Sequence, residues 1–466
     1  MARRAAQYGP AEKGVGSLQR WAGWGRQGTL RPGRGGGTVE PLDFKARPAS
    51  SLPVPFFALG LVGFCALATA VALLPRAIHW PLHAHGVFLL HLAVLGWLTP
   101  VMMGADLQLV PVVLHRPLRG PRLGALVFWV YAAGATVFLA GWASAHPGWI
   151  ALGGAAAGAA LLTFCGQMAV ALAGLRRISP PALGLAGGLL FLVANALLGP
   201  WMALAIGQVV AAPMFATLRE LHAIAGLAGW ILLTIMGATY QLVPFFAASA
   251  PGTPARFGTV AVAAAGLGAL ALFVSGLTPA VPPQVGVSCA ALGMAMWLYD
   301  LARMVRRGRQ SRREPVVAFS LAAAGAVALG GAAAVLAWRA GAPDLTLAAC
   351  VVGLVAGPSL LILGQLQKIL PLIASLDAAL AAKRRGRVPK TEELFPRRRA
   401  AWLLGLAAAG FLAEAIGVAV PSDQTLRAGS LTLLVSALLY GGQQARAFCT
   451  WAKARQQPSK NLQAGN

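Results

Sequence analysis

Charged residues are scarce in this sequence, and acidic residues are the scarcest. Only 11% of the 466 residues are charged, with 13 acidic side chains against 38 basic ones, while 58% are hydrophobic. Together with a mean hydropathy of +0.69, this composition excludes an ordinary soluble protein. The net charge of +25 is weak evidence for nucleic acid, because membrane topology accounts for it, as shown below.

The sequence shows no obvious cysteine pair and no pattern of a cleavable signal peptide, so we expect the first span to be retained. Five cysteines stand singly in or near apolar segments, without a CxxC metal motif or an obvious disulfide pair. The first fifty residues are rich in Gly and Arg, and no short apolar core with a cleavage site follows them. We therefore expect residues 1–50 to form a disordered basic cytoplasmic tail.

Apolar runs long enough to cross about 30 Å of hydrocarbon recur twelve times along the chain. We expect an all-α polytopic membrane protein, with a single transmembrane domain over residues 51–450 and a short cytoplasmic tail over 451–466. The expected spans are residues 52–74, 82–110, 122–144, 148–174, 183–206, 218–247, 257–277, 284–304, 315–338, 345–375, 399–420 and 425–447.

Basic residues alternate between the loops, as expected because Lys and Arg accumulate on the cytoplasmic side. One set of loops carries clusters such as the six arginines between residues 303 and 313. The other set holds only Arg76, Arg219, Arg339 and Arg427. This pattern predicts a bacterial inner-membrane protein with both termini cytoplasmic, in contact with anionic membrane lipids.

A short motif recurs three times at a nearly constant interval. It reads Gly104, Gln108, Pro111, then Gly237, Gln241, Pro244, and more weakly Gly364, Lys368, Pro371. The glycines are 133 and 127 residues apart, and each motif falls on the second span of four. We expect the three motif prolines to close these helices at their cytoplasmic ends. We therefore expect three parallel four-helix pseudo-repeats over about 51–178, 179–312 and 313–450.

Histidines supply the candidate chemistry, because ionisable groups inside spans suggest function and imidazole binds heme iron and copper. His83 and His85 lie at the outer mouth of span 2, His91 about two turns deeper, and His222 near the outer end of span 6. Relative to the motif glycine, His85 and His222 differ by four residues, about one helical turn. We expect His85, His91 and His222 to bind a cofactor, and His83, His85 and His222 to bind a metal. His115, in a basic cytoplasmic loop, is not expected to take part.

The twelve-helix, three-repeat pattern with histidines on second helices resembles subunit I of the heme-copper oxidase superfamily, including its nitric oxide reductase branch. The string HWPLHAHGVFLL at residues 79–90 also resembles the WHAHE signature of the NnrS family. The resemblance implies that His85 or His91 corresponds to the low-spin heme ligand, and His222 to a copper ligand. It also implies heme b, copper and a periplasmic electron donor or c-type cytochrome as partner.

The ligand set of those oxidases is incomplete here, because spans 7 and 10 contain no histidine, and Gly86 replaces the NnrS glutamate. We therefore expect a divergent relative of an oxidase or nitric oxide reductase that lacks the full catalytic set. Its expected role is in electron transfer, nitric oxide or metal stress.

Other polar residues inside the spans keep an alternative open. Lys368 either snorkels to the surface or pairs with Asp106, and Glu414 lies at a depth where it could orient an imidazole or pass a proton. A bundle with such groups also fits a secondary transporter of a small solute or metal without a cofactor. Cofactor content distinguishes the two interpretations.

Overall fold

The computed structural model describes residues 49–113, 117–173, 178–247, 256–308, 314–381 and 394–456, all within one compact unit, Val39–Asn466. These residues contain helices and loops and no β-strand. Most of both expected tails, and His115, lie outside the described residues. The last helix continues to Gln456, so it enters the segment that we expected to be a C-terminal tail.

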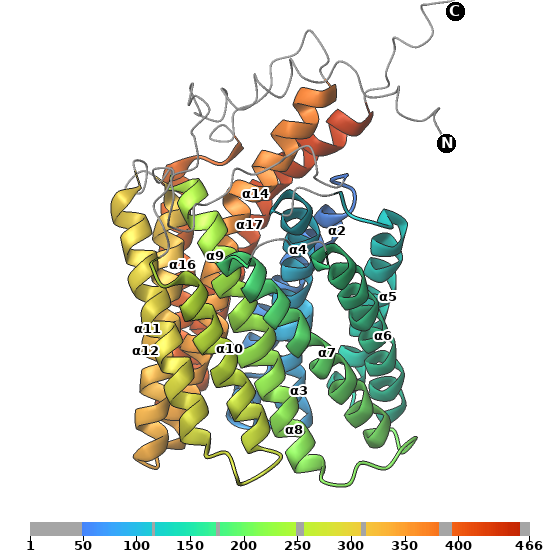
Figure 1. Cartoon of the computed structure of the whole chain (residues 1–466), viewed down its shortest axis with the longest axis vertical. Helices are drawn as coiled ribbons and strands as arrows, with labels where there is room; N and C mark the ends of the chain where they lie inside the picture. The colour runs from blue at the N-terminus through green and yellow to red at the C-terminus, as the bar shows by residue number, and fades with distance from the viewer. Residues whose placement is uncertain are drawn as a thin grey trace, which may run out of the picture. The chain divides into compact units, whose positions relative to one another are not determined.

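The helices follow one another in the order expected from the apolar runs (Figure 1). In chain order they are α2 (Pro53–Leu73), η2 (Pro75–His79), α3 (Ala84–His91), η3 (Leu92–Leu98), α4 (Thr99–Val113), α5 (Pro121–Ala143), α6 (Pro147–Leu172), α7 (Pro180–Ile206), α8 (Phe215–Ile224), η4 (Ala225–Leu232), α9 (Leu233–Phe246), α10 (Gly258–Ser275), α11 (Pro283–Arg307), α12 (Pro315–Arg339), α13 (Pro343–Cys350), η5 (Val351–Ala356), α14 (Gly357–Ala381), α16 (Arg397–Ala419) and α17 (Asp423–Gln456).

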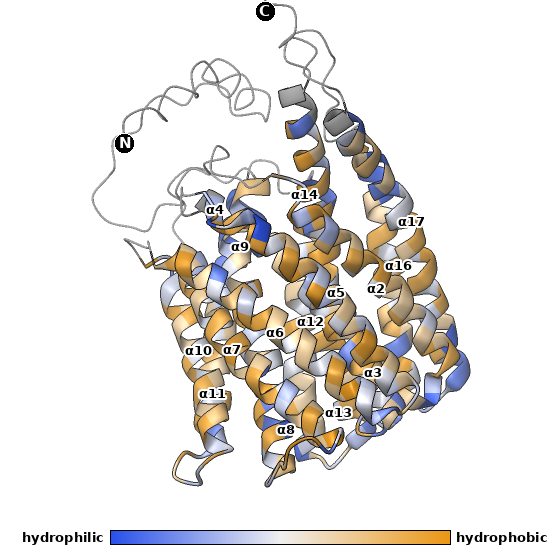
Figure 2. Cartoon of the chain, turned by 90° about the vertical axis from the view of Figure 1, so that its right-hand side faces the viewer, coloured by the Kyte–Doolittle hydropathy of each residue, from blue (hydrophilic) through white to orange (hydrophobic). Residues whose placement is uncertain are grey.

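Eleven helices of the described chain are long and apolar enough to cross a membrane. Hydrophobic residues run along these helices, and hydrophilic residues gather toward the helix ends (Figure 2). The twelfth expected span, residues 425–447, coincides with α17, which is helical but is not among the eleven. Its apolar stretch is interrupted by Arg427, Gln443 and Gln444. A multi-pass membrane protein is therefore established, and the number twelve stays a prediction.

Three long helices contain a π-helical segment each, and we call them the interrupted helices: α3–η3–α4, α8–η4–α9 and α13–η5–α14. The segments begin twelve, twelve and thirteen residues before Gly104, Gly237 and Gly364. Such segments are rare and often lie at functional sites. One local distortion thus recurs at nearly one register in the three helices that carry the repeated motif.

The interrupted helices form the interior of the bundle. In their apolar windows 67%, 61% and 72% of residues are buried, against 28% to 56% in the other eight candidate spans. The indole nitrogen Nε1 of Trp97 on the first donates to Oγ of Ser359 on the third at 2.9 Å. The groups that these three helices carry are therefore more enclosed than those on the surrounding helices.

Each motif glycine has a packing reason. The first helix of the same expected repeat lies against it: Gly104 faces Phe56 and Phe57 of α2, Gly237 faces Gly184 of α7, and Gly364 faces Phe319 of α12. A side chain at any of these glycines would meet neighbouring atoms at 3.0 Å or less. Small residues permit this close approach. In lipid, where the hydrophobic effect does not drive helices together, such close packing stabilises their association.

The motif prolines lie inside helices, and this corrects one expectation. Helices α4 and α9 end two residues after Pro111 and Pro244, but α14 continues past Pro371 to Ala381. We expected every motif proline to close its helix. Farther back on the same helix, the Tyr440 hydroxyl of α17 donates to Leu363 O at 2.8 Å, which ties α17 to α14.

Candidate functional site

Two histidines from different interrupted helices meet near the end of the bundle where α3 and α8 lie (Figure 1). His91 is the last residue of α3, directly before η3, and His222 lies in the last turn of α8, just before η4. Their ring centroids are 6.2 Å apart, and the ring planes differ by 21°. Segments 131 residues apart in the sequence therefore bring two imidazoles together.

The ring of His91 is held in one orientation. Its Nδ1 lies 2.9 Å from the carbonyl oxygen of Val87. Because a carbonyl can only accept, Nδ1 must donate, and the lone pair of a neutral ring is then on Nε2. The edge of Phe138, from α5, packs on the other side with centroids 5.1 Å apart. His91 thus has the fixed tautomer that is typical of a metal ligand.

The ring of His222 is packed on its helix-facing side but lacks a polar partner. It lies against Gly199 of α7, where an added Cβ would be 2.9 Å from Cε1. The Asn195 side chain donates to the carbonyl of His222 at 2.9 Å and so fixes the backbone. Nδ1 of His222 is buried without a hydrogen-bond partner in the described structure. A buried orphan nitrogen needs an explanation, and an ion is one of the usual ones.

The two rings are stacked, with their planes 21° from parallel, and Nδ1 of His222 lies on the side of Gly199. The observed centroid distance is 6.2 Å. Within the described ranges no group of three or more His, Cys, Asp or Glu residues could hold a metal ion. Among these four residue types the pair offers two ligands, and His83 and His85 of the expected metal set line a separate cleft.

His85 is placed differently from our expectation. With His83 it is exposed and lines a cleft of about 560 Å³ beside η2, whereas His91 meets His222. The reason is depth. Relative to the motif glycine, His91 is two residues from the level of His222, about 3 Å, whereas His85 is four residues away, about 6 Å. Of the three histidines expected to bind a cofactor, the structure brings His91 and His222 together and places His85 in the cleft.

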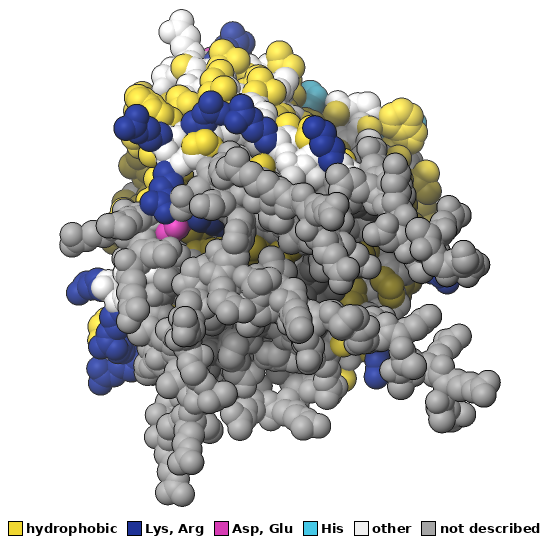
Figure 3. Space-filling model, turned by 90° about the horizontal axis from the view of Figure 1, so that it is seen from above, with side chains coloured by type: hydrophobic (Ala, Val, Ile, Leu, Met, Phe, Trp, Pro, Cys, Tyr) yellow, Lys and Arg dark blue, Asp and Glu magenta, His cyan; other side chains and the backbone are white. Residues whose placement is uncertain are grey.

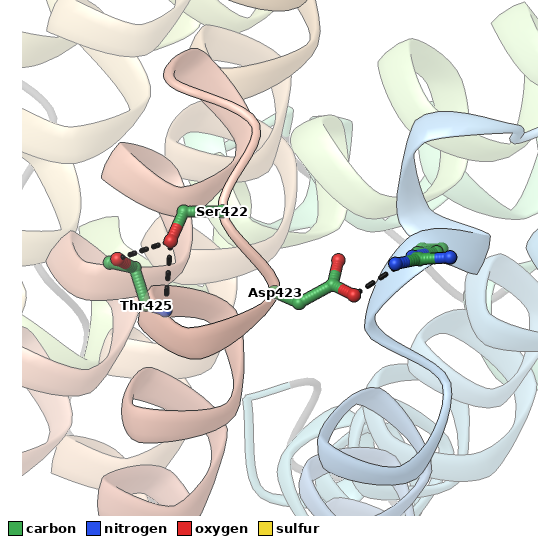
Figure 4. Close-up of polar contacts among 4 residues, drawn as sticks. Ser422, Asp423 and Thr425 are labelled. Atoms are coloured by element: carbon green, nitrogen blue, oxygen red, sulfur yellow. Dashed lines mark hydrogen bonds and ion pairs between the residues drawn. The ribbon is translucent and has the colours of Figure 1, made fainter.

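The same cleft contains the ion pair that joins η2 to the start of α17. Nε of Arg76 lies 2.8 Å from Oδ2 of Asp423, and the side chain of Ser422 accepts from the backbone N–H of Thr425 (Figure 4). The remaining outer histidines make local contacts. His146 caps α6 through Trp149, and Nδ1 of His79 lies 3.9 Å from Oδ1 of Asp344.

Lys368 does not pair with Asp106. Its Nζ lies 2.6 Å from Oε2 of Glu314, and Nη2 of Arg397 lies 3.5 Å from Oε1 of the same carboxylate. The carboxylate of Glu314 is nearly fully buried. Several Lys and Arg side chains are exposed on the face of the molecule seen from above (Figure 3). Asp106 is buried on α4, and its Oδ2 has no hydrogen-bond partner among the described groups.

Glu414 is tied to a neighbouring helix and not to an imidazole. Its Oε1 accepts from the hydroxyl of Ser430 at 2.7 Å, which links α16 to α17. Among the described residues its hydrogen-bond partner is Ser430, so the structure shows no contact for the role that we expected, in orienting a histidine.

One buried carboxylate escaped the sequence analysis. Asp300 of α11 accepts from the Tyr240 hydroxyl at 3.3 Å and from the backbone N–H groups of Arg256 and Phe257 at 2.9 Å each. It therefore fixes the start of α10 against α9. A lone aspartate within an apolar run was the signal available in the sequence.

Comparison with known proteins assigns this chain to no family. The chain matches no protein-family model and no curated protein. The candidate site therefore rests on the residues and their geometry.

Proposed function

We propose that this chain is an integral membrane protein that holds a copper ion or heme b iron between His91 and His222. One observation carries the proposal: two imidazoles from separate interrupted helices stand 6.2 Å apart, and Nδ1 of His222 is buried without a partner. Imidazole is a common ligand for both copper and heme iron. A bare ion needs only the space between the rings, whereas a porphyrin needs a slot between packed helices, so we place copper first.

Each surrounding residue has a role in such a site. Val87 accepts from His91 and orients its ring, while Asn195 holds the backbone of His222. Phe138 and Gly199 pack against the two rings, so they exclude water and leave little freedom for ring rotation. A metal bound there would supply one-electron redox chemistry. The protein contribution is to fix two neutral nitrogen ligands in apolar surroundings.

We also propose that the fold consists of three parallel four-helix repeats, as in subunit I of the heme-copper oxidases, which the sequence resembles. Support comes from the recurring π segments and from the packing of α2, α7 and α12 on the three motif glycines. By that resemblance, the function lies in electron transfer, nitric oxide or metal stress with a periplasmic electron donor. The missing histidines in spans 7 and 10 argue against a complete terminal oxidase.

A test follows from metal content. Protein made with ample copper and heme is purified in detergent, and its copper is measured by elemental analysis and its heme by absorption spectroscopy. We expect about one metal centre per chain, reduced at least fivefold in His91→Ala and His222→Ala. His146→Ala, which removes a histidine that caps α6, should keep the wild-type content. A wild-type protein that carries neither copper nor heme contradicts the proposal.

A transporter is the second candidate, because polar atoms without partners line the interior. Among described residues, buried orphan atoms occur on Asp106, Gln108, Gln365, Gln367 and Gln443. In lipid such groups face a water-filled path or a transported solute more often than apolar side chains do. If the metal test fails, a secondary transporter without a cofactor becomes the better interpretation.

A further inference from the structure

We propose that the cleft between η2 and the start of α17 binds a small oxyanion, a phosphate or carboxylate group. We call it the outer cleft, and its volume is about 560 Å³. This site is separate from the histidine pair, since neither His91 nor His222 is among its lining residues. The polar and aromatic side chains that line it are Arg76, Trp80, His83, His85, Asp423 and Arg427.

The positive charge of the outer cleft is unexpected on this side of the protein. Arginines in cytoplasmic loops set the orientation of a membrane protein. The loops that we assign to the outer side contain only four arginines. Two of these four, Arg76 and Arg427, converge on the one cleft although 351 residues separate them in the sequence. Topology does not require cationic residues here, so their convergence indicates a ligand of opposite charge.

The ion pair within the cleft leaves the guanidinium of Arg427 available for a ligand. Asp423 and Arg427 are four residues apart on α17, the usual spacing for a helical ion pair. Asp423 instead pairs with Arg76 at 2.8 Å. No described carboxylate forms an ion pair with Arg427, which is exposed. Counting its arginine and aspartate side chains, the cleft therefore carries one uncompensated positive charge.

The donors of the cleft match an oxyanion. A guanidinium presents a planar fork of N–H groups that fits phosphate or carboxylate oxygens in a bidentate manner. His83 and His85 each contribute an imidazole N–H in any protonation state. The start of α17 adds the positive end of a helix dipole. The cleft is also larger than one phosphate ion, so a lipid headgroup or a free anion can supply the oxyanion.

The experiment measures inorganic phosphate binding to the purified full chain by calorimetry, in nonionic detergent at low ionic strength. Arg427→Gln should weaken binding about tenfold or more, because it removes a charge-assisted contact. Arg427→Lys keeps the charge but loses the fork, so its affinity should be intermediate. Arg339→Gln is the matched control, since Arg339 is another exposed outer arginine that does not line the cleft. It should bind phosphate as the wild type does.

A second arm identifies the source of the oxyanion. Native mass spectrometry compares retained phosphatidylglycerol and phosphatidylcholine. If free phosphate does not bind, but the wild type prefers phosphatidylglycerol and Arg427→Gln loses this preference, the oxyanion is a lipid headgroup. The proposal is overturned if neither ligand shows Arg427-dependent binding, or if Arg339→Gln weakens binding equally. The proposal is also overturned if the cleft binds copper and no oxyanion, and if the double variant His83→Gln/His85→Gln abolishes that copper binding.

Discussion

Glu314 shows how a single buried charge is made tolerable in this bundle. Its carboxylate stands at the start of α12, and Lys368 from α14 and Arg397 from α16 contact one oxygen each. Burying a carboxylate is costly unless it is paired. The cluster therefore joins three helices at one end of the bundle. The sequence alone does not show that these three charges meet.

Replacing one member of this cluster should destabilise the protein. We expect Lys368→Met to lower the free energy of unfolding by about 1 to 3 kcal/mol, because Glu314 loses its nearest counter-charge. The effect is less than for a fully buried pair, since Arg397 remains and Lys368 is one fifth exposed. Thermal unfolding in detergent measures it. The double variant Glu314→Gln/Lys368→Met should recover most of the loss, and equal stability of Lys368→Met and wild type would contradict the assignment.

The interrupted helices are the elements that set the site. Each π segment adds residues to one turn and frees backbone carbonyls, and one of these, Leu95 O, accepts from the Tyr131 hydroxyl at 2.7 Å. His91 lies directly before one such segment, and His222 lies three residues before another. The third segment begins after Cys350, which is not part of any metal-binding group among the described residues. Only two of the three elements therefore carry imidazoles at this level.

Because these helices pack closely, replacing different glycines with alanine should change the stability of the protein by very different amounts. In Gly184→Ala the new Cβ would lie 2.6 Å from Cα of Gly237 and from the carbonyl oxygen of Leu233, both backbone atoms. We expect a loss of about 1 to 3 kcal/mol of stability from this overpacking. Gly325→Ala on α12 is the control, because nothing lies within 4 Å of its Cβ. It should be neutral or slightly stabilising, since alanine favours helix. Similar melting temperatures for both variants would argue against the α7–α9 contact.

At the scale of the whole molecule, α17 decides the topology. It packs against α14, α16 and α2, so it completes the bundle beside the first helix. Its residues are not apolar enough to place it among the eleven candidate spans. Twelve crossings put both termini on one side of the membrane, whereas eleven put them on opposite sides. The arginine-rich loops favour the even number.

Reporter fusions test this assignment. A reporter that is active only in the cytoplasm, fused after Asn466 and separately before Met1, should be active in both positions. A reporter that is active only outside the membrane should be silent at both. If the C-terminal fusion is active only outside, α17 does not cross the bilayer and the count is eleven.

The sequence by itself determined the helical membrane class, the order of the helices and the register of the three motif glycines. These properties are local, since an apolar run of sufficient length forms a spanning helix whatever surrounds it. The tertiary structure decided that His91 and not His85 meets His222, and that Lys368 pairs with Glu314 and not with Asp106. It also decided that Arg76 and Arg427 share a cleft. Each of these contacts depends on the relative depth and rotation of helices far apart in the chain, which no local pattern specifies.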